Sequence, residues 1–340
     1  MHMFRSSFAI LLITGILVTG CNPDDPEISE SIAGNRVTSI HIDAEGIRWF
    51  ATENGLSAWD GSEWKNYTSV DGLPAARIRD MADRNNSSGS QLLVGTDQGA
   101  GIAEKVRNLI QSVEIWFASN SGLAGDSISS VMHDHQDVTW FGTGQGVSAQ
   151  RGSQWLDGDE NYFIKDFVIT AIAPGPDSIS FVCLTGLGIA LMNPSVDAVT
   201  TVTYYSWPYS PLPSYNITSI YVKDYHHQWI GTDSGLAFHG NFDPKKEWEF
   251  FFEEDGLVNN HVMSVQGDGN GITWIGTVNG VSRYDGENWT SYGTGDGLAG
   301  DTVFSIAMDH DGSVWFGTNQ GASHFNGTTW TNYQCSCQSD

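Results

Sequence analysis

Short apolar runs alternate with turns rich in glycine, asparagine and aspartate along residues 37–333. The runs contain many β-branched and aromatic residues and show no helical period, so they favour strands. In the first part of this region the pattern predicts four strands, over Val37–Asp43, Ile47–Thr52, Leu56–Asp60 and Glu63–Thr68. Turns such as Glu53-Asn54-Gly55 supply the positive φ that tight hairpins need. An all-β protein is therefore expected.

These strands belong to a repeat. An anchor residue, usually tryptophan, is followed by an apolar residue, a small residue, threonine, two variable residues and glycine. The anchors are Trp49, Leu93, Trp140, Trp229, Trp274 and Trp315, with a seventh, eroded copy over Phe181–Gly188. From Trp49 to Trp315 six steps average about 44 residues, the length of a four-stranded propeller blade.

The start of each repeat can be located independently of the anchors. A short apolar strand start lies twelve residues before six of the anchors and fifteen before Leu93, where the polar loop tip 85–88 is inserted. The eroded copy keeps the spacing of twelve. The expected starts are 37, 78, 128, 169, 217, 262 and 303. The sequence thus predicts a seven-bladed β-propeller of four-stranded antiparallel blades over 36–334, closed without strand exchange.

The N-terminus is typical of an exported lipoprotein. Residues 1–20 contain Arg5 and an apolar run from Phe8 to Val18, which is too short to span a bilayer. Cys21 directly follows Gly20 in a segment that resembles a bacterial lipobox, so we expect lipidation there. Residues 21–35 are interpreted as an acidic, proline-containing tether and 335–340 as a C-terminal tail. The expected location is the cell envelope, with the chain lipid-anchored to the outer membrane.

Charge narrows the range of partners. Forty acidic residues stand against fifteen basic ones, giving a formal net charge of −25. Such a chain repels phosphate backbones and anionic lipid headgroups, so we expect no nucleic acid partner and membrane contact through the lipid anchor alone. The remaining partners are an extracytoplasmic glycan, a peptide or a protein.

The repeat also resembles a known family. The unit Val-x-x-Ile-x-x-Asp-x-x-Gly-x-x-Trp-Ile/Phe-Gly-Thr-x-x-Gly-Leu, followed by Asp-Gly-Leu at 71–73, 255–257 and 296–298, is similar to the two-component-regulator propeller repeat. That repeat forms the periplasmic sensor half of hybrid sensor kinases in Bacteroidetes and also occurs in lipoproteins. No kinase segment is recognisable in these residues. The resemblance therefore implies the propeller and a habit of binding extracytoplasmic ligands, not the signalling step.

The main alternative function is a metal-dependent lyase of the streptogramin-lyase type, which is also a seven-bladed propeller. Such a site needs a metal, a base and converging His and Glu groups. The histidines cluster only at His133-Asp134-His135 and His226-His227, both in expected turns. The segments Asp309–Gly312 and Asp268–Gly271 resemble the start of a calcium loop but lack its closing glutamate.

The remaining cysteines give no further chemistry. Cys183 lies in a strand-like run and is expected in the core. Cys335 and Cys337 have no second pair at metal-ligand spacing, so zinc is not supported. We therefore expect no metal, no cofactor and no catalytic residue.

Propellers bind ligands where variable loops meet a rigid scaffold, at a face or channel mouth. The inter-blade loops end just before the innermost strands, at one mouth of the ring. Their residues vary chemically while the framework repeats, although unconstrained surface would vary in the same way. The candidate ligand-binding residues are Arg36, Arg77, Asp126, Asn216, His261 and Asp301.

Overall fold

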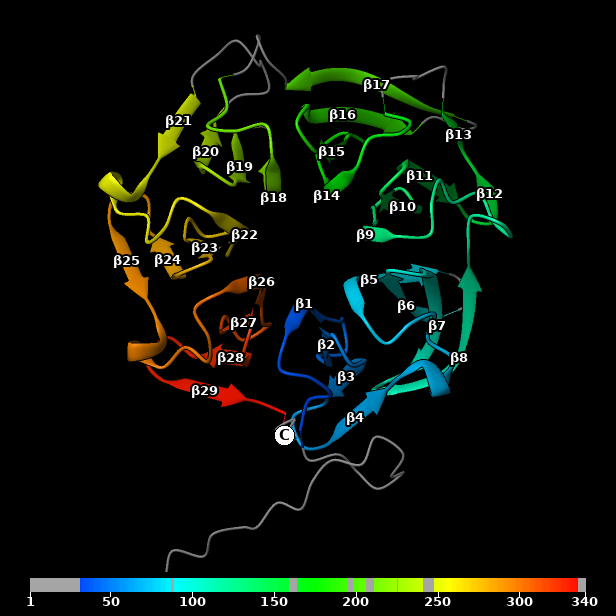
Figure 1. Cartoon of the computed structure of the whole chain (residues 1–340), viewed down its shortest axis with the longest axis horizontal. Helices are drawn as coiled ribbons and strands as arrows, with labels where there is room; N and C mark the ends of the chain where they lie inside the picture. Colours follow the sequence, from blue (N-terminus) through cyan, green and yellow to red (C-terminus); the bar gives the residue numbers. More distant parts are fainter. Residues whose placement is uncertain are drawn as a thin grey trace, which may run out of the picture.

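The computed structural model describes residues 31–86, 89–158, 164–194, 198–205, 211–224, 226–240 and 248–335. Seven sheets formed by these residues stand around a central axis as the blades of a propeller (Figure 1). The predicted seven-bladed fold is confirmed. The expected signal peptide, Cys21 and most of the tether lie outside the described residues.

Each blade uses consecutive strands, and its first strand is the innermost (Figure 1). Blade 1 comprises β1 (Val37–Ile42), β2 (Arg48–Thr52), β3 (Leu56–Trp59) and β4 (Trp64–Tyr67). Blade 2 comprises β5 (Ile78–Asn86), β6 (Gly89–Thr96), β7 (Gly99–Val106) and β8 (Leu109–Trp116). Blade 3 comprises β9 (Ile128–His133), β10 (Val138–Thr143), β11 (Gly146–Arg151) and β12 (Gln154–Trp155). Blade 4 comprises β14 (Ile169–Pro174), β15 (Ser180–Leu184), β16 (Gly188–Pro194) and β17 (Ala198–Tyr205).

The last three blades follow the same order. Blade 5 comprises β18 (Ile217–Asp224), β19 (His227–Thr232), β20 (Gly235–His239) and β21 (Trp248–Phe251). Blade 6 comprises β22 (Val262–Gly267), β23 (Thr273–Thr277), β24 (Gly280–Tyr284) and β25 (Trp289–Tyr292). Blade 7 comprises β26 (Val303–Met308), β27 (Val314–Thr318), β28 (Gly321–Phe325) and β29 (Trp330–Tyr333). The inner strands begin at the seven residues from which the repeats were counted.

Two blades depart from the regular pattern. In blade 4 a short strand, β13 (Asp157–Gly158), pairs in parallel with β17 and adds a fifth strand at the outer edge. In blade 2 the inserted polar residues lengthen the β5–β6 hairpin, which pairs from Ile78–Thr96 to Asn86–Gly89. Both departures leave the inner part of the ring unchanged.

The threonine of the repeat fixes the turn between the second and third strands. The Thr52 hydroxyl donates to the Gly55 carbonyl at 2.8 Å and accepts the Asn54 N–H at 3.1 Å. Gly55 takes a φ of 145°, which a side chain would oppose. The same bridge occurs at Thr96, Thr143, Thr232, Thr277 and Thr318, all fully buried. This explains why the motif recurs so strictly.

The glycine before that threonine lets neighbouring blades approach. A Cβ built on Gly95 would lie 2.7 Å from Cγ2 of Ile128, the first residue of the next blade. A Cβ on Gly317 would likewise lie 2.9 Å from Cγ1 of Val37. Blade 7 therefore meets blade 1 as blade 2 meets blade 3. Among the described residues no strand is exchanged between these two blades.

Buried aromatic residues fill the space between blades. Trp49, Trp140 and Trp315 are at most 1% exposed. The Phe50 ring meets the Trp315 ring edge-on at 5.3 Å across the ring closure. Cys183 is fully buried as predicted, and burial raises the pKa of its thiol. The core thus consists of inter-blade layers.

Short 3-10 turns lie in the connections that lead into blades 2, 6 and 7. The Asp-Gly-Leu segments close the 3-10 turns η1 (Ser69–Asp71), η2 (Glu253–Asp255) and η3 (Thr294–Asp296), and the leucine that follows each is buried. Ile32 and Ala33 take the equivalent place before blade 1. Ile32 is fully buried, and the Ala33 N–H donates to Ser57 Oγ at 2.8 Å. The end of the expected tether is therefore packed on the propeller.

The C-terminal end of the described chain also lies beside the start of blade 1. The Cys335 N–H donates to Asn35 Oδ1 at 2.7 Å, which holds the last described residue beside the start of blade 1. In the part of the chain that the structure describes, no helix is long and apolar enough to cross a membrane.

Candidate functional site

The six predicted binding residues occupy equivalent places at one mouth of the ring. Arg36, Arg77, Asn216 and His261 each immediately precede the innermost strand of a blade, at β1, β5, β18 and β22. Asp126 and Asp301 lie two residues before β9 and β26. All are exposed except Asp301, which is half-buried. Whether they bind a ligand remains a prediction.

Three of these residues are held by acidic side chains from the adjacent turn of their own blade. Arg77 Nη1 lies 3.6 Å from Asp97 Oδ2. Asn216 Nδ2 donates to Asp233 Oδ2 at 2.9 Å, and the Arg36 N–H donates to Glu53 Oε2 at the same distance. The turn between the second and third strands therefore positions the mouth residues.

The surroundings of Asp233 favour its ionised form. Burial alone would raise the pKa of this carboxyl, but hydrogen bonds from Ser214, Asn216 and Ser234 outweigh it. The positive charge of His261 in the next blade lowers the pKa further. Asn216 thus contacts this carboxylate directly, and His261 acts on it only through its charge, across the junction of blades 5 and 6.

The two predicted aspartates stabilise their own loops. Asp126 Oδ1 accepts the Ala118 N–H at 2.6 Å, and Asp301 Oδ1 accepts the Thr294 N–H at 3.0 Å. The Arg36 guanidinium lies 4.4 Å above the Phe304 ring of blade 7. Each of these side chains has a structural partner within the mouth itself.

Asp80 was missed by sequence reasoning and joins three blades. Its carboxylate accepts hydrogen bonds from the Ser39 hydroxyl of blade 1 at 3.0 Å and from the Ser130 hydroxyl of blade 3 at 3.1 Å. It also accepts the Val131 N–H at 3.0 Å. Burial raises the pKa of Asp80 more than these hydrogen bonds lower it. The signal was present, because most blades have serine at this position of the inner strand.

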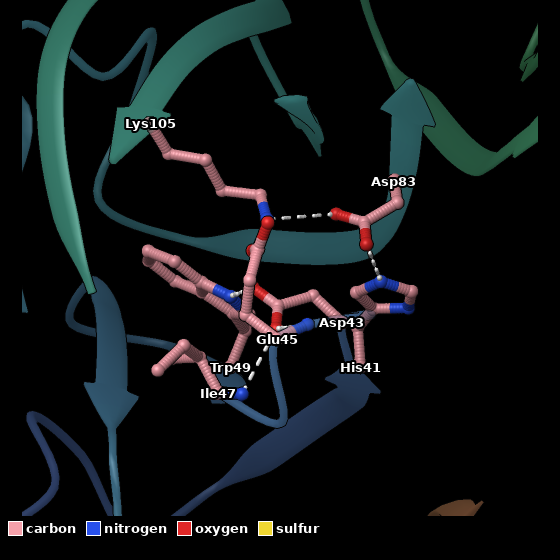
Figure 2. Close-up of polar contacts among 7 residues, drawn as sticks. All are labelled: His41, Asp43, Glu45, Ile47, Trp49, Asp83 and Lys105. Carbon is pink, nitrogen blue, oxygen red and sulfur yellow. Dashed lines mark hydrogen bonds and ion pairs between the residues drawn. The ribbon is translucent and has the colours of Figure 1, made fainter. Parts of the chain in front are cut away.

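A second polar network lies on the opposite face, at the junction of blades 1 and 2 (Figure 2). The fully buried Lys105 ammonium donates to Asp43 Oδ2 at 2.7 Å and to Glu45 Oε2 at 3.3 Å. Asp83 Oδ1 lies 3.4 Å away, and its other oxygen lies 3.2 Å from His41 Nε2. Asp43 also accepts the Trp49 indole N–H at 2.9 Å.

Charge compensation controls this network. Burial opposes the charge on Lys105, but the hydrogen bond to Asp43 and the neighbouring carboxylates outweigh it and raise the pKa of the ammonium. Burial would likewise raise the pKa of Asp83, yet the hydrogen bond from His41 and the charges of His41 and Lys105 lower it. The group therefore links blades 1 and 2 through ion pairs.

The histidine clusters lie in separate blades. His133 Nδ1 is 3.0 Å from Thr139 Oγ1, and burial lowers its pKa. His227 Nδ1 lies 2.8 Å from Asp224 Oδ1 in its own turn. Among the described residues, no group of three His, Cys, Asp or Glu side chains could hold a metal ion.

The two calcium-like segments are hairpin turns. Asp268 Oδ1 accepts the N–H groups of Asn270 and Ile272, at 2.7 and 3.0 Å. Asp309 Oδ2 accepts the Trp315 indole N–H at 2.9 Å and the Arg48 Nε–H at 2.8 Å. Turn closure and an ion pair therefore account for both aspartates.

One segment of the repeat matches the model of a known family. Residues 297–320 match the two component regulator propeller family. The predicted resemblance is confirmed. The matched segment runs from the end of η3 through β27, so it contains the Gly-Leu entry and the Trp-Phe-Gly-Thr core of blade 7. No curated protein matches the chain.

Solved structures share the fold at low identity. The extracellular domain of a hybrid two component system from B. thetaiotaomicron superposes with a TM-score of 0.70 and 20% identity, over 87% of this chain and 39% of that one. A streptogramin B lyase superposes with a TM-score of 0.67 and 15% identity, over 87% of this chain and 95% of the lyase. PorZ of Porphyromonas gingivalis, a surface component of the type-IX secretion system, superposes with a TM-score of 0.61 and 12% identity. The superposition covers 91% of this chain and 39% of PorZ. The chain spans well under half the length of the first and third of these.

Proposed function

We propose that this protein is a non-catalytic, extracytoplasmic binding protein of the sensor type. It takes a glycan, a peptide or a protein partner at the face that carries the inter-blade loops. Lipidation at Cys21 anchors it to the outer membrane. The fold that it shares with the extracellular domain of a hybrid two component system supports the sensor interpretation.

The observation that carries the proposal is the arrangement at the mouth. The closed ring brings seven inner-strand starts together, and the residues before them differ in charge and hydrogen-bonding capacity. Turn carboxylates hold several of these residues in place, as Asp97 holds Arg77. Rigid presentation of varied side chains is what a selective binding face requires.

Arg77 is the best single probe of this face. Its side chain is 45% exposed, and one ion pair at 3.6 Å uses few of the five donors of a guanidinium. The free donors suit a carboxylate or the hydroxyl groups of a sugar. Arg77→Ala removes these donors and only an exposed ion pair, so the fold should tolerate the change.

The experiment is a calorimetric titration of the full chain with an oligogalacturonate, a neutral cello-oligosaccharide and blocked acidic peptides. The control is Arg107→Ala, which removes an exposed arginine of the same blade from the opposite face. Binding that is weakened by Arg77→Ala and unchanged by Arg107→Ala supports the proposal. Equal affinity in both variants contradicts the placement of the site, and turnover of a probe that requires a divalent metal supports the lyase alternative.

A further inference from the structure

A cavity of about 530 Å³ opens between blades 5 and 6. It is lined by the ends of β18–β21 and by β22, the β22–β23 turn and β24. These segments include the first-to-second-strand turn, so the cavity lies on the face opposite the inter-blade loops. None of the six predicted mouth residues lines it.

One wall is a row of cross-strand neighbours on blade 5. Tyr221 pairs with Trp229, Trp229 with Phe238, and Phe238 with Glu249. Partners in register lie on the same side of a sheet, so three aromatic rings lead to one exposed carboxylate. Tyr284 of blade 6 closes the cavity from the other side, with its ring 5.9 Å from that of Trp229.

The junction of blades 1 and 2 shows why this space is open. There Lys105 of blade 2 extends toward blade 1 and pairs with Asp43 and Glu45, while Asp83 of blade 2 pairs with Lys105 and with His41 of blade 1 (Figure 2). Counted from the start of the inner strand, the equivalent of Asp83 in blade 6 is Gly267.

The equivalent of Lys105 is also a glycine. Counted from the glycine that opens the third strand, Lys105 corresponds to Gly286. Both of these glycines line the cavity. The two side chains that fill the junction in one place are therefore missing in the other.

Gly267 has a direct role in shaping the cavity. A Cβ at this position would lie 2.3 Å from Cε1 of Tyr221, so the tyrosine ring occupies the space that a side chain would need. The other six blades have larger residues here: Ile42, Asp83, His133, Pro174, Val222 and Met308. Blade 6 alone replaces its own side chain with an aromatic ring from the neighbouring blade.

Acidic side chains outnumber basic ones around the cavity, where Asp285 Oδ2 also lies 3.7 Å from Arg283 Nη1. Glu249 and Asp285 line it, and together with Glu287 they add to burial in raising the pKa of Tyr284. Asp268 and Asp224 do the same to Tyr221, again after burial. The one lysine of the lining, Lys223, donates to the Gly269 carbonyl at 2.7 Å.

We propose that this cavity binds an alkylammonium group, supplied by a lysine side chain of a peptide or by a free polyamine. Aromatic faces carry negative charge density and attract cations, and an ion pair with Glu249 adds to that attraction. The acidic chain, with a net charge of −25, concentrates such ligands near its surface. The proposal names a second site and does not depend on ligand binding at the mouth.

The test is a calorimetric titration of the full chain with two ammonium probes, 1,5-diaminopentane and a blocked Gly-Lys-Gly peptide. The matched ligand control is a blocked Gly-norleucine-Gly peptide, which keeps the alkyl chain and lacks the ammonium. Binding of either ammonium probe is expected, and binding of the norleucine peptide is not. The stronger of the two probes identifies the source of the group.

Three variants separate the site from general attraction to an acidic protein. Glu249→Gln is expected to weaken binding about three- to fivefold, as loss of an exposed ion pair does. Phe238→Leu keeps an apolar side chain but removes the ring, and should weaken binding to a similar degree of about threefold. Glu254→Gln removes the same charge from η2, in the loop that joins blades 5 and 6 on the opposite face, and should leave affinity unchanged.

Several results would overturn the proposal. These are no binding of either ammonium probe, equal weakening by Glu249→Gln and Glu254→Gln, or binding of a neutral cello-oligosaccharide that Phe238→Leu alone weakens. The last result would identify a saccharide site. Glu249 is exposed, so the Glu249→Gln variant should fold. The test therefore remains decisive even if the Phe238→Leu variant does not fold. Arg77→Ala should have no effect here, which distinguishes failure of this proposal from failure at the mouth.

Discussion

Replacement of Lys105 by methionine should destabilise the propeller strongly at the junction of blades 1 and 2. The Lys105 ammonium and the Asp43 carboxylate are both fully buried, 2.7 Å apart, and Asp83 is only 13% exposed. Methionine keeps most of the apolar stem and removes the charge, leaving the carboxylates without their shared cation. Breaking a buried pair in this way costs about 3–5 kcal/mol in free energy of unfolding.

The assay is urea unfolding followed by circular dichroism at pH 7, with Lys165→Met as the control. Lys165 is exposed, so its variant should change the free energy of unfolding by less than about 0.5 kcal/mol. A Lys105→Met effect within the same range would show that the buried carboxylates do not depend on the lysine. The account of the network as a charge-compensated link would then be wrong.

The pH dependence gives an independent check on the same variant. The pKa of Asp83 is lowered in the folded protein, so its stabilising contribution is present above the ordinary carboxyl pKa and is lost as pH falls through the folded value. Lys105 contributes to that lowering, and its removal moves the folded pKa of Asp83 upward. The wild type should therefore lose more stability than the variant on acidification toward pH 3. A difference that is constant with pH would contradict this linkage.

Three further predictions concern ring closure, the core and the anchor. Arg48→Met should lower the free energy of unfolding by about 3 kcal/mol, because it leaves the buried Asp309 carboxylate of blade 7 without its cation; urea unfolding measures this. Trp274→Ala should cost about 3–5 kcal/mol in the same assay, and a change below about 0.5 kcal/mol would place that ring at the surface. Cys21→Ser should release the protein from membranes and abolish labelling by a fatty acid, which membrane fractionation and labelling of both forms would check.

The fold could be predicted because the repeat encodes contacts that recur in most blades. Thr52 and its equivalents close one turn, and Gly95 and its equivalents admit the first residue of the next blade. Both leave a regular trace in the sequence. Even blade 4, which has lost the tryptophan, keeps the spacing between Ile169 and Phe181.

The packed end of the expected tether was not predicted, for a clear reason. Ile32 acts as the entry residue of blade 1, in the place that Leu73 takes before blade 2. Before blades 2, 6 and 7 that place is marked by Asp-Gly-Leu, but before blade 1 the motif is absent. One buried isoleucine behind a polar segment gives too little pattern to separate it from a linker.

The polar networks could not be predicted from spacing. Lys105 and Asp43 are 62 residues apart and belong to different blades, and Arg48 and Asp309 are 261 apart. The aspartate of each link belongs to the repeat, but its cation occurs at a single junction, so the repeat does not mark the pair. Asp80 was within reach, because an aspartate in a column of mostly serine residues is visible once the inner strands are aligned.

The junctions between blades, rather than the blades themselves, are where this propeller differs from place to place. Blade 7 closes on blade 1 through Arg48 and Asp309, and blade 1 meets blade 2 through Lys105. Between blades 5 and 6, glycine replaces the filling side chains and aromatic rings line the space that results. Changes of this kind leave the turn threonines and the packing glycines untouched, so they cost the scaffold little. On the proposal that the cavity binds an ammonium group, the repeat fold acquires a ligand site by omitting a side chain at one junction, and Gly267 is the position where that omission is most direct.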